Sequence, residues 1–487
     1  MKPDEFRLHA HEVVDWIADY LEHAERYPVC SRSRPGDLLA ALPASPPEEG
    51  ESMAAILADF ERDVMPGVTH WNHPRFFAYF PANNSGPSIL GEMLSAGLGV
   101  NGMLWQTSPA ATELEQRMMA WLGQLIGLPE GFHGVIHDTA STATFCALVC
   151  ARERTTGFEA NRAGLGAAGT GAAGNGALRI YASREAHSSV LKGARLAGFG
   201  ADNVVAVGLD AERRLDPADL EGLIAADTAA GLRPCAVVAT VGTTGCTAID
   251  PLAAIGPVCR RHDVWLHVDA ALAGTAAILP AMRWILDGVE HADSLVFNPH
   301  KWLLTNFDCS AFYVRDPDHL QQAMAIHPEY LRTTRDAEVV NYMDWGVQLG
   351  RRFRALKLWF VLRSYGARRL REIVAGHLEL AREFAGWVDA APDWERLAPV
   401  PLNTVCFRWR PAGITDPATL DERNAALMAH VNREGTIYLT HTRLDDVTTL
   451  RLAIGQRATQ REHVQQAWDA LRAGASAISR GGNDHAE

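Results

Sequence analysis

The stretch Phe297-Asn298-Pro299-His300-Lys301-Trp302 decides which fold and which chemistry this sequence predicts. A short apolar run, residues 294–297, reads as a strand and leads directly into it. Lysines normally lie on solvated faces, and a buried lysine tends to lose its proton. A neutral amine is a nucleophile that forms a Schiff base with an aldehyde. On its own, Lys301 also fits a lysine at a strand end with its ammonium in water, so the rest of the chain must decide.

Composition limits the kinds of protein this chain can be. Its 487 residues, 47% of them hydrophobic, can bury a large core. The net charge of -13 and the absence of a long basic run argue against nucleic acid and anionic membrane as partners. The sequence contains no run of about 20 apolar residues, so we expect no membrane span. The first residues lack the apolar segment of a signal peptide. Eight scattered cysteines without a Cys-x-x-Cys pair indicate reduced thiols, so we expect a cytoplasmic protein.

From about residue 134 onward, short β-branched runs alternate with helical segments. This alternation predicts an α/β fold with a mostly parallel central sheet and helices on both faces. A smaller α/β unit follows a long helical segment, residues 347–385, that is broken at Gly366. The expected strands are residues 134–136, 178–182, 204–208, 236–241, 264–268, 294–297 and 311–314 in the large unit, and 404–409, 435–439 and 448–454 in the small one.

The N-terminal segment predicts two amphipathic helices, at residues 5–25 and 52–64. Lone helices cannot bury their apolar faces, so we expect this arm to pack on a second subunit and form a homodimer. A mobile loop rich in Gly and Ala is expected at 159–177. The domains that we expect are a helical dimerisation arm (1–85), a large α/β domain (86–375), a small C-terminal α/β domain (376–480) and a disordered tail (481–487).

Polar side chains follow several expected strands, at the sheet edge where α/β proteins bind ligands. Residues 139–144 place small hydroxyl side chains at a helix N-terminus, which suits a phosphate, although Thr139 or Ser141 equally fits an ordinary N-cap. His187 follows another strand and also fits a helix start. Residues 242–245 form a polar turn after a third strand, which simple turn chemistry also explains.

Asp269 ends an apolar strand, where an acid is costly unless it is paired or accepts backbone hydrogen bonds. His267 shares a strand face with it, as two metal ligands would. No further ligand stands at a recognisable spacing, so we expect no metal.

An amine nucleophile, a phosphate cradle, a buried acid and a histidine on neighbouring strand ends are what pyridoxal 5′-phosphate (PLP) requires. No Gly-x-x-x-x-Gly-Lys-Ser/Thr motif supports a P-loop. No Gly-x-Gly-x-x-Gly opens a helix after a strand, so a dinucleotide site is unsupported. The sequence therefore favours a PLP enzyme.

Nearly the whole chain, from Phe6 to about Leu471, resembles the group II PLP-dependent decarboxylases, specifically the aromatic-L-amino-acid decarboxylases. The resemblance implies a fold-type-I PLP enzyme that is an intertwined homodimer. The motifs that carry it are His70-Trp71, Phe77-Ala78-Tyr79-Phe80-Pro81, Ser108-Pro109-Ala110, Thr112-Glu113-Leu114-Glu115, Ala186-His187-Ser188-Ser189, His267-Val268-Asp269-Ala270-Ala271, Asn298-Pro299-His300-Lys301-Trp302 and Leu349-Gly350-Arg351-Arg352-Phe353-Arg354.

The resemblance also implies roles for single residues. Lys301 resembles the Schiff-base lysine, Asp269 the partner of the pyridine nitrogen, and His187 the imidazole stacked on the cofactor ring. Tyr330 resembles a tyrosine on the family's mobile catalytic loop and is the candidate acid that returns a proton to Cα. The further positions implied to hold the cofactor are Thr139, Ala140, Ser141, Thr244, Ala271, Asn298, His300 and Gly350.

Tyr330 also separates two reactions within the family. A phenylalanine there suits interception of the carbanion by O₂, which gives an aldehyde, so tyrosine argues for simple decarboxylation to the amine. The alternatives are a decarboxylating aldehyde synthase, an aminotransferase, or a catalytically silent PLP-fold binding protein. The presence of Lys301, Asp269 and Tyr330 argues against the last.

The substrate pocket both keeps and departs from the family pattern. The aromatic wall is kept, whereas Asn101 and Met103 stand where the family's animal enzymes have apolar or aromatic residues. Leu272 replaces a tyrosine and Ala82 a threonine. We expect an aromatic amino acid (DOPA, tyrosine, tryptophan or 5-hydroxytryptophan), and we hypothesise that Asn101 favours a ring hydroxyl. The substrate residues that we expect are Trp71, Tyr79, Phe80, Pro81, Asn101 and Met103.

Overall fold

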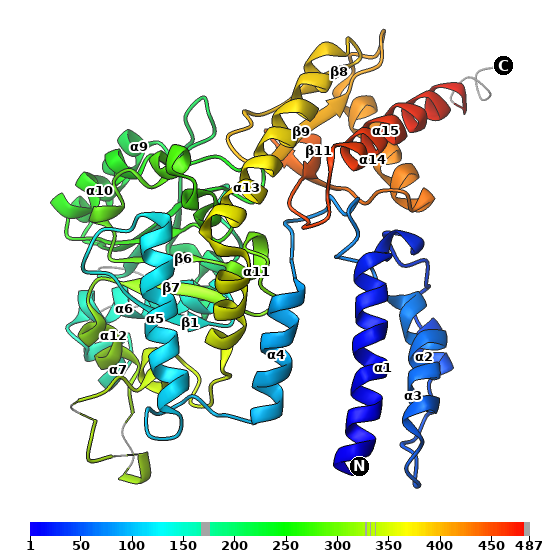
Figure 1. Cartoon of the computed structure of the whole chain (residues 1–487). Coiled ribbons are helices and arrows are strands. Elements are labelled where there is room, and N and C mark those ends of the chain that lie inside the picture. Colours follow the sequence, from blue (N-terminus) through cyan, green and yellow to red (C-terminus); the bar gives the residue numbers. More distant parts are fainter. Residues whose placement is uncertain (167–175, 327–328, 332, 337, 482–487) are drawn as a thin grey trace. The chain divides into compact units, whose positions relative to one another are not determined.

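The computed structural model of the chain describes residues 1–166, 176–326, 329–331, 333–336 and 338–481 (Figure 1). The chain forms two compact units. The first contains Met1–Pro81, Arg382–Leu397 and Cys406–Glu487, and the second contains Ala82–Ala381 and Ala398–Val405. Half of the loop expected at 159–177 and nearly all of the tail expected at 481–487 lie outside the described residues. The division into arm, large domain, small domain and tail stays a prediction.

The second unit is built on a seven-stranded sheet with the order β1-β7-β6-β5-β4-β2-β3. β7 runs antiparallel to both of its neighbours, and the other neighbouring strands are parallel. All seven strands expected in this unit are confirmed, because their β-branched runs are buried on a sheet. The strands are β1 (His133–His137), β2 (Leu178–Ser183), β3 (Val204–Val207), β4 (Arg233–Thr240), β5 (Trp265–Asp269), β6 (Ser294–Phe297) and β7 (Ser310–Val314).

Helix α6 (Ala140–Thr156) packs on one face of this sheet and contacts five of its strands, β1 and β4 to β7. It begins where Thr139 Oγ1 accepts the Thr142 amide hydrogen at 3.4 Å, and it ends at Gly157, whose φ of 62° is left-handed. Small side chains such as Ala147 let the helix approach the sheet closely, and they share a buried cluster with strand residues such as Val238. This close packing fixes the N-terminus of α6 at the sheet edge.

The remaining helices of the second unit surround the sheet, and α9 and α10 lie side by side in Figure 1. The long helix α13 (Arg354–Ala390) continues from the second unit into the first, and the expected break at Gly366 is confirmed by its non-helical φ of 67°. The other elements are α4 (Gly86–Leu98), α5 (Pro109–Ile126), α7 (Glu159–Ala163), α8 (Ser189–Leu196), α9 (Pro217–Ala229), α10 (Leu252–Arg261), α11 (Pro299–Trp302), α12 (Pro317–Met324), and the short helices η4 (Ala201–Asn203), η5 (Ala273–Ile278), η6 (Pro280–Leu286), η7 (Val289–His291), η8 (Glu329–Leu331) and η9 (Tyr342–Trp345).

The first unit combines N-terminal helices with a four-stranded antiparallel sheet of order β10-β11-β9-β8. Its helices are α1 (Pro3–Glu22), α2 (Asp37–Ala41), α3 (Met53–Asp59), α14 (Pro417–Glu434) and α15 (Arg461–Gly481), with the short η1 (Ala24–Arg26), η2 (Phe60–Val64) and η3 (Met65–Gly67). Its strands are β8 (Trp394–Arg396), β9 (Thr404–Trp409), β10 (Thr440–Leu444) and β11 (Val447–Ala453). The sequence did not predict β8.

The strand expected at 435–439 is wrong. Gly435 is the left-handed C-cap of α14, with a φ of 76°, and β10 begins only at Thr440. The Asn432 side chain accepts the Leu439 amide hydrogen at 2.9 Å and donates to the Leu439 carbonyl at 3.0 Å. This side chain therefore binds backbone groups that a strand would have paired.

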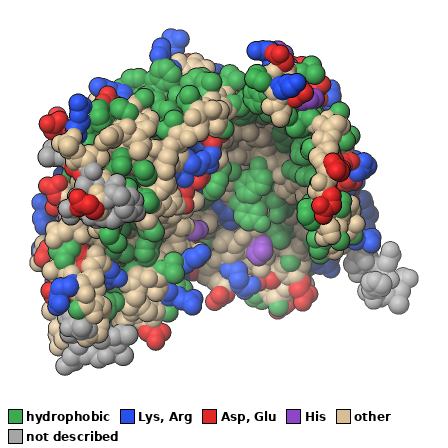
Figure 2. Space-filling view, turned by 90° about the horizontal axis from the view of Figure 1, so that it is seen from below, with side chains coloured by type: hydrophobic (Ala, Val, Ile, Leu, Met, Phe, Trp, Pro, Cys, Tyr) green, Lys and Arg blue, Asp and Glu red, His purple; other side chains and the backbone are tan. Residues whose placement is uncertain are grey.

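Several helices expose apolar side chains, α1 and α4 among them, and Figure 2 shows hydrophobic side chains among charged ones on one face of the molecule. In α1, Phe6 is 65% and Leu8 60% exposed; in α4, Leu94 is 52% and Leu98 62% exposed. Among the helices of the described residues, none combines the length and the apolar character that a bilayer crossing requires. Exposed apolar faces of this kind mark surfaces that suit a protein partner.

Candidate functional site

The strand register brings the predicted site residues of the second unit to one edge of the sheet. Asp269 ends β5 and pairs with Val296 of β6, so Asn298 follows two residues later on the neighbouring strand. His137, at the end of β1, pairs with Ser310 at the start of β7. The N-terminus of α6 and the start of α11 therefore lie at the same edge of the sheet, with β7 between the strands that precede them.

Lys301 lies in the short helix α11 and is mostly buried. The Asn83 amide donates to the Lys301 carbonyl at 2.8 Å, and the Lys301 amide donates to the Asn298 carbonyl at 3.0 Å, which fixes the lysine backbone. Burial lowers the pKa of Lys301, and the negative charge of Asp269 acts in the opposite direction. The structure thus contains an amine that gives up its proton more readily than a surface lysine does.

Asp269 is 4% exposed and forms the acidic part of the site. Its carboxylate accepts the Ala271 amide hydrogen at 3.0 Å, which orients it at the strand end. His187 follows β2, and its Nδ1 accepts the Ser189 amide hydrogen at 3.1 Å, which orients the ring. Burial lowers the pKa of His187, Asp269 raises it and Lys301 lowers it, so the three side chains act on one another.

The expected phosphate cradle lies beside these residues. The first amides of α6, which include those of Ala140 and Ser141, have no intrahelical acceptor and suit an anion. Asn298 Oδ1 accepts the hydroxyl hydrogen of Ser310 at 2.6 Å, so the Asn298 amide group keeps its donors. His300 is 3% exposed and lies one residue from Lys301. The structure therefore brings together hydrogen-bond donors from α6 and α11.

Three other residues expected to hold the cofactor differ in their surroundings. Ala271 donates its amide to Asp269, as described, and its carbonyl accepts the Asn298 amide hydrogen at 2.9 Å. Thr244 is exposed in the turn after β4. Gly350 lies beside the Asn101 side chain, and its predicted role in binding the cofactor stays a prediction.

Tyr330 lies in η8, and its side chain is outside the described part of the structure. The next residue, Leu331, is 6% exposed and clusters with Leu104 and Met343, with Met103 packed against them. The Met103 carbonyl also accepts the Met343 amide hydrogen at 3.0 Å. Met103 thus lies beside the segment that carries Tyr330.

Asn101 makes structural contacts that the sequence could not predict. Its Oδ1 accepts the Arg351 amide hydrogen at 2.9 Å, and its Nδ2 lies 3.7 Å from Met103 Sδ. Arg351 in turn forms a buried ion pair with Glu115 at 2.7 Å. The Nδ2 group of Asn101 remains suited to a further polar partner. The Oδ1 contact with Arg351 gives the residue a structural role as well.

The aromatic residues expected to line the substrate pocket lie in the first unit. The rings of Trp71 and Tyr79 stack with centroids 5.8 Å apart, and Arg451 lies over Phe80 at 5.2 Å. Pro81 is buried. Tyr79 has a φ of 50°, a strained value for a non-glycine residue, and such strain is typical of functional sites. Trp71 and Tyr79 belong to an aromatic cluster with Phe76 and Tyr438 of the same unit.

His267, which shares a strand face with Asp269 as a second metal ligand would, is a core residue. Its Nδ1 lies 2.9 Å from Ser294 Oγ and its Nε2 lies 3.3 Å from Thr144 Oγ1, so both ring nitrogens have hydroxyl partners. Burial lowers its pKa to about 4. Within the described ranges, no group of three or more His, Cys, Asp or Glu side chains is arranged to hold a metal ion.

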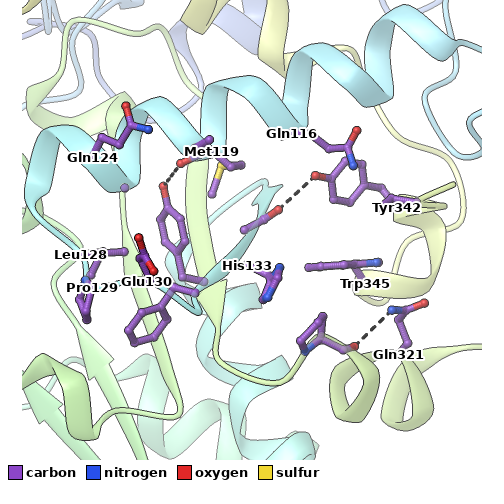
Figure 3. A pocket seen from close by; sticks show the side chains of 17 residues that line it. Gln116, Met119, Gln124, Leu128, Pro129, Glu130, His133, Gln321, Tyr342 and Trp345 are labelled. Carbon is purple, nitrogen blue, oxygen red and sulfur yellow. Dashed lines mark hydrogen bonds between the residues drawn. The ribbon is translucent and has the colours of Figure 1, made fainter.

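A separate cavity of about 470 Å³ lies at the other end of β1 (Figure 3). Tyr342 donates its hydroxyl to the Gly134 carbonyl at 3.2 Å, and Tyr313 donates to the Met119 carbonyl at 2.8 Å. Its lining also includes Trp345 and belongs to α5, β1, β7, α12 and η9. None of the residues around Lys301 reaches this cavity.

The residues around Lys301 fit PLP. A mostly buried amine with a lowered pKa suits an aldehyde, a buried carboxylate suits the pyridine nitrogen, and the start of α6 suits a phosphate. These parts stand on neighbouring strand ends of one sheet, as the register requires.

Comparisons with known proteins agree with this fit. The chain matches the pyridoxal-dependent decarboxylase conserved domain over residues 35–410. It is 42% identical over 491 residues to tyrosine decarboxylase 4 of Petroselinum crispum, covering 98% of this chain and 94% of the relative. It is 41% identical over 486 residues to phenylacetaldehyde synthase of Arabidopsis thaliana, covering 98% and 97%. A crystal structure of Oryza sativa TDC with PLP and tryptamine superposes with a TM-score of 0.94 at 37% identity, covering 98% of this chain and 99% of that one.

This chain belongs to the pyridoxal-dependent decarboxylase family. It has the fold of the fold-type-I PLP decarboxylases, and it is a PLP-dependent amino-acid carboxy-lyase. The expectations of PLP as cofactor and of a decarboxylase are thereby confirmed.

A group of charged residues near His300 was not predicted from the sequence, and it consists of Glu92, Asp308, Arg352, Arg354 and Lys357. A usable signal was present, because Lys357 lies among Leu356, Leu358 and Trp359 in an otherwise apolar stretch. Their acidic partners come from distant segments, which the sequence alone does not connect.

Proposed function

We propose that this enzyme converts an aromatic L-amino acid into the corresponding amine and CO₂. The observation that carries the proposal is the joint placement of Lys301, Asp269 and His187 at one sheet edge, in a chain of the pyridoxal-dependent decarboxylase family. Relatives named for tyrosine decarboxylation and phenylacetaldehyde synthesis support an aromatic substrate. The reaction breaks the bond between Cα and the carboxylate and leaves its electron pair at Cα.

Each residue has a defined task in this proposal. PLP, when bound, supplies the ring that accepts the electron pair. Lys301 binds the cofactor through its amine, Asp269 keeps a proton on the pyridine nitrogen, and His187 holds the ring in place. Each pKa unit by which Asp269 raises that nitrogen favours its protonated form by about 1.4 kcal/mol. Donors from the start of α6, Asn298 and His300 bind the phosphate.

Tyr330 is the proposed acid that returns a proton to Cα. This role favours the amine over the aldehyde as product. Leu331 supports it by anchoring the same short helix in a buried cluster with Leu104 and Met343. A second product remains a specific candidate, because aldehyde synthases are about as similar to this chain as the decarboxylases are.

The first experiment is a product assay. The purified holoenzyme is given tyrosine, DOPA, tryptophan, 5-hydroxytryptophan and phenylalanine, and CO₂, amine, aldehyde and peroxide are measured. We expect amine and CO₂ in equal amounts without peroxide, and Tyr330→Phe should shift the products toward aldehyde and peroxide. If no aromatic amino acid releases CO₂, the substrate class is wrong. If the wild type produces peroxide and aldehyde in proportion to CO₂, the role of Tyr330 is wrong.

Asn101 is the proposed specificity residue. Among the described residues, its Nδ2 group has the Met103 sulfur as its acceptor at 3.7 Å, which leaves donor capacity for a ring hydroxyl. The ratio of kcat/KM for DOPA to that for phenylalanine should fall in Asn101→Leu. An unchanged ratio would remove this hypothesis.

We further propose a cytoplasmic homodimer that binds neither nucleic acid nor membrane. The dimer is supported by α1, which buries none of its residues within its own unit, and by the exposed leucines of α4. The eight free thiols, of which seven are buried, support a reducing compartment. Analytical ultracentrifugation should give twice the chain mass of 53.1 kDa.

A further inference from the structure

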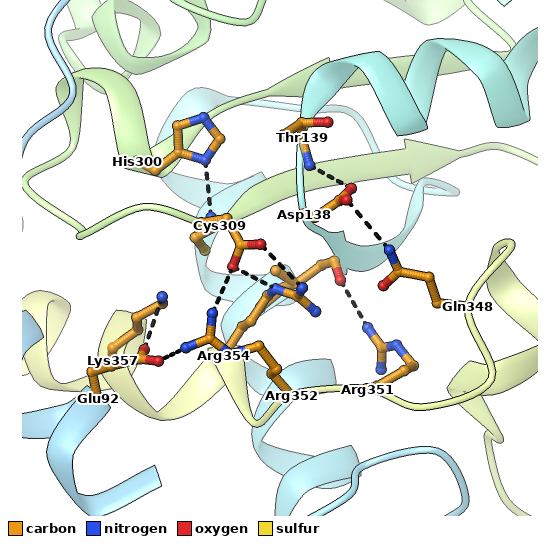
Figure 4. Close-up of polar contacts among 12 residues, drawn as sticks. Glu92, Asp138, Thr139, His300, Cys309, Gln348, Arg351, Arg352, Arg354 and Lys357 are labelled. Carbon is orange, nitrogen blue, oxygen red and sulfur yellow. Dashed lines mark hydrogen bonds and ion pairs between the residues drawn. The ribbon is translucent and has the colours of Figure 1, made fainter. Parts of the chain in front are cut away.

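Asp308 is held by two arginines at the start of α13 (Figure 4). Arg354 Nε donates to Asp308 Oδ1 at 3.0 Å and Arg354 Nη2 donates to Oδ2 at 3.2 Å, so the pair is bidentate. Arg352 Nη1 adds a longer contact with Oδ1 at 3.4 Å. The Arg354 and Asp308 side chains are 6% and 15% exposed, which protects the pair from solvent. A bidentate arginine pair fixes direction as well as distance.

The residue after Asp308 fixes the imidazole of His300. The Cys309 amide donates to His300 Nδ1 at 2.9 Å, and the Cys309 carbonyl accepts the His300 amide hydrogen at 3.2 Å. A nitrogen that accepts an amide hydrogen carries no proton, so the neutral ring has its proton on Nε2. The ring of Phe307 packs on the imidazole, with centroids 4.5 Å apart. His300 is thus held in one orientation and one tautomer.

Lys357 adds a buried positive charge behind the same ring. Its side chain is 0% exposed, and Nζ forms an ion pair with Glu92 Oε2 at 2.9 Å. Burial lowers the pKa of His300 to about 3, with Lys301 and then Lys357 acting in the same direction and Asp308 against it. The charged groups that face this ring therefore favour a neutral imidazole.

We propose that Asp308, clamped by Arg354, is the positioning residue that fixes the orientation and tautomer of His300 through the backbone of Cys309. His300 then presents a fixed Nε2–H to the phosphate of PLP. The proposal rests on the proposed function, because it takes His300 as a residue that binds the phosphate. The clamp acts at a distance, since Asp308 and Arg354 need no contact with the cofactor.

The experiment compares PLP binding by four purified variants. Arg354→Lys keeps the charge but removes the bidentate fork, and Asp308→Asn removes the charge that the fork binds. His300→Gln removes the imidazole. Arg369→Lys is the matched control, because Arg369 lies on the same helix in an exposed pair with Glu372. The dissociation constant for PLP is measured at pH 8 after removal of the cofactor, for these variants and for the double variant Arg354→Lys/His300→Gln, and circular dichroism verifies the fold.

We expect Arg354→Lys and Asp308→Asn to weaken PLP binding about tenfold at pH 8, as expected for loss of one oriented hydrogen bond to a charged group. The control should bind like the wild type. Because the clamp acts only through the imidazole, Arg354→Lys combined with His300→Gln should weaken PLP binding no more than His300→Gln does alone.

Three outcomes would contradict the proposal, and they separate the possible failures. If His300→Gln binds PLP like the wild type, His300 does not bind the phosphate, and the proposed phosphate contact and the clamp are both wrong. If His300→Gln weakens binding but neither clamp variant does, only the positioning role is wrong. If the losses from Arg354→Lys and His300→Gln add in the double variant, the clamp gives only general support, and the positioning role is also wrong.

Discussion

Two buried lysines, Lys301 and Lys357, lie in very different surroundings. Burial lowers the pKa of both: the direction is clear for Lys301, and the pKa of Lys357 falls to about 8. The acid that acts on Lys301 is Asp269, whose own carboxylate is oriented by the Ala271 amide. Lys357 instead has Glu92 at 2.9 Å in a direct ion pair. Lys301 is therefore placed to react as an amine, whereas Lys357 carries a positive charge in an ion pair.

The difference shows that burial alone does not identify a reactive lysine. What distinguishes Lys301 is its place just after a parallel strand, where the ends of neighbouring strands bring further polar groups. Lys357 projects from the long helix α13, where its ion pair with α4 contributes to packing and electrostatic potential. Mutations of the two lysines and their acids should separate these tasks.

Replacing Lys301 should have the largest effect. Lys301→Ala removes the amine that binds the cofactor, so kcat should fall by at least about 10³-fold. The absorbance band of the lysine-bound cofactor should also disappear. The control is Lys192→Ala, an exposed lysine on α8, which should retain both the band and the activity. A variant without Lys301 that keeps both would contradict the assignment.

Replacing the acid beside Lys301 should come next. Asp269→Asn keeps the shape of the side chain but not its charge, so the proton on the cofactor nitrogen is held less strongly. A loss of about two pKa units at that nitrogen corresponds to about 10²-fold in kcat/KM. Steady-state rates of CO₂ release measure it. A rate within a factor of two of wild type would show that Asp269 does not hold this proton.

Replacing the acid beside Lys357 should act mainly on stability. Glu92→Gln leaves a buried ammonium without its anion, which should cost about 2–3 kcal/mol of unfolding free energy. Lys357→Met removes the buried charge and should cost less than about 1 kcal/mol, because Glu92 keeps Arg352 as a partner. Urea unfolding at one fixed protein concentration compares the two variants. Equal losses of unfolding free energy in the two variants would mean that the ion pair itself contributes the stability. They would contradict a separate cost of leaving the buried ammonium unpaired.

The last effect is a pH dependence of stability that develops only above pH 8. The pKa of Lys357 is lowered from 10.5 to about 8, so below pH 8 the folded protein carries the full cost of the buried charge. Above pH 8 the folded form loses this proton before the unfolded form does, and the cost falls. Relative to Lys357→Met, the wild type should therefore become more stable between pH 8 and 10, by about 2 kcal/mol. Thermal unfolding across this range tests the sign.

The sequence predicted the large sheet well because each of its strands is a compact β-branched run with a helix nearby. It failed at 435–439, where Thr436, Ile437 and Tyr438 favour a strand but the side chain of Asn432 binds the backbone. That contact depends on the geometry at the end of α14, which the strand propensity of these residues does not predict. The strand β8 has only three residues, too few for a pattern.

Part of the candidate site was predictable from its positions after strands, and the contacts that hold the site residues in place were not. Lys301, Asp269 and His187 follow strands, so parallel topology alone places them at one edge. The partners of Asn101 and His300 were not predictable, because Arg351 and Cys309 bind them through backbone amides. Every residue type except proline can supply such an amide hydrogen, so the sequence does not indicate which one binds.

The spread of the site along the chain has a consequence for biosynthesis. The cofactor-binding groups begin near Thr139, and the clamp on His300 is complete only when Arg354 has been made. A ribosome therefore synthesises most of this chain before the site can close. In the described part of the sheet, β1 pairs with β7 alone and must wait for it. Cofactor capture should accordingly begin only after most of the chain has been synthesised.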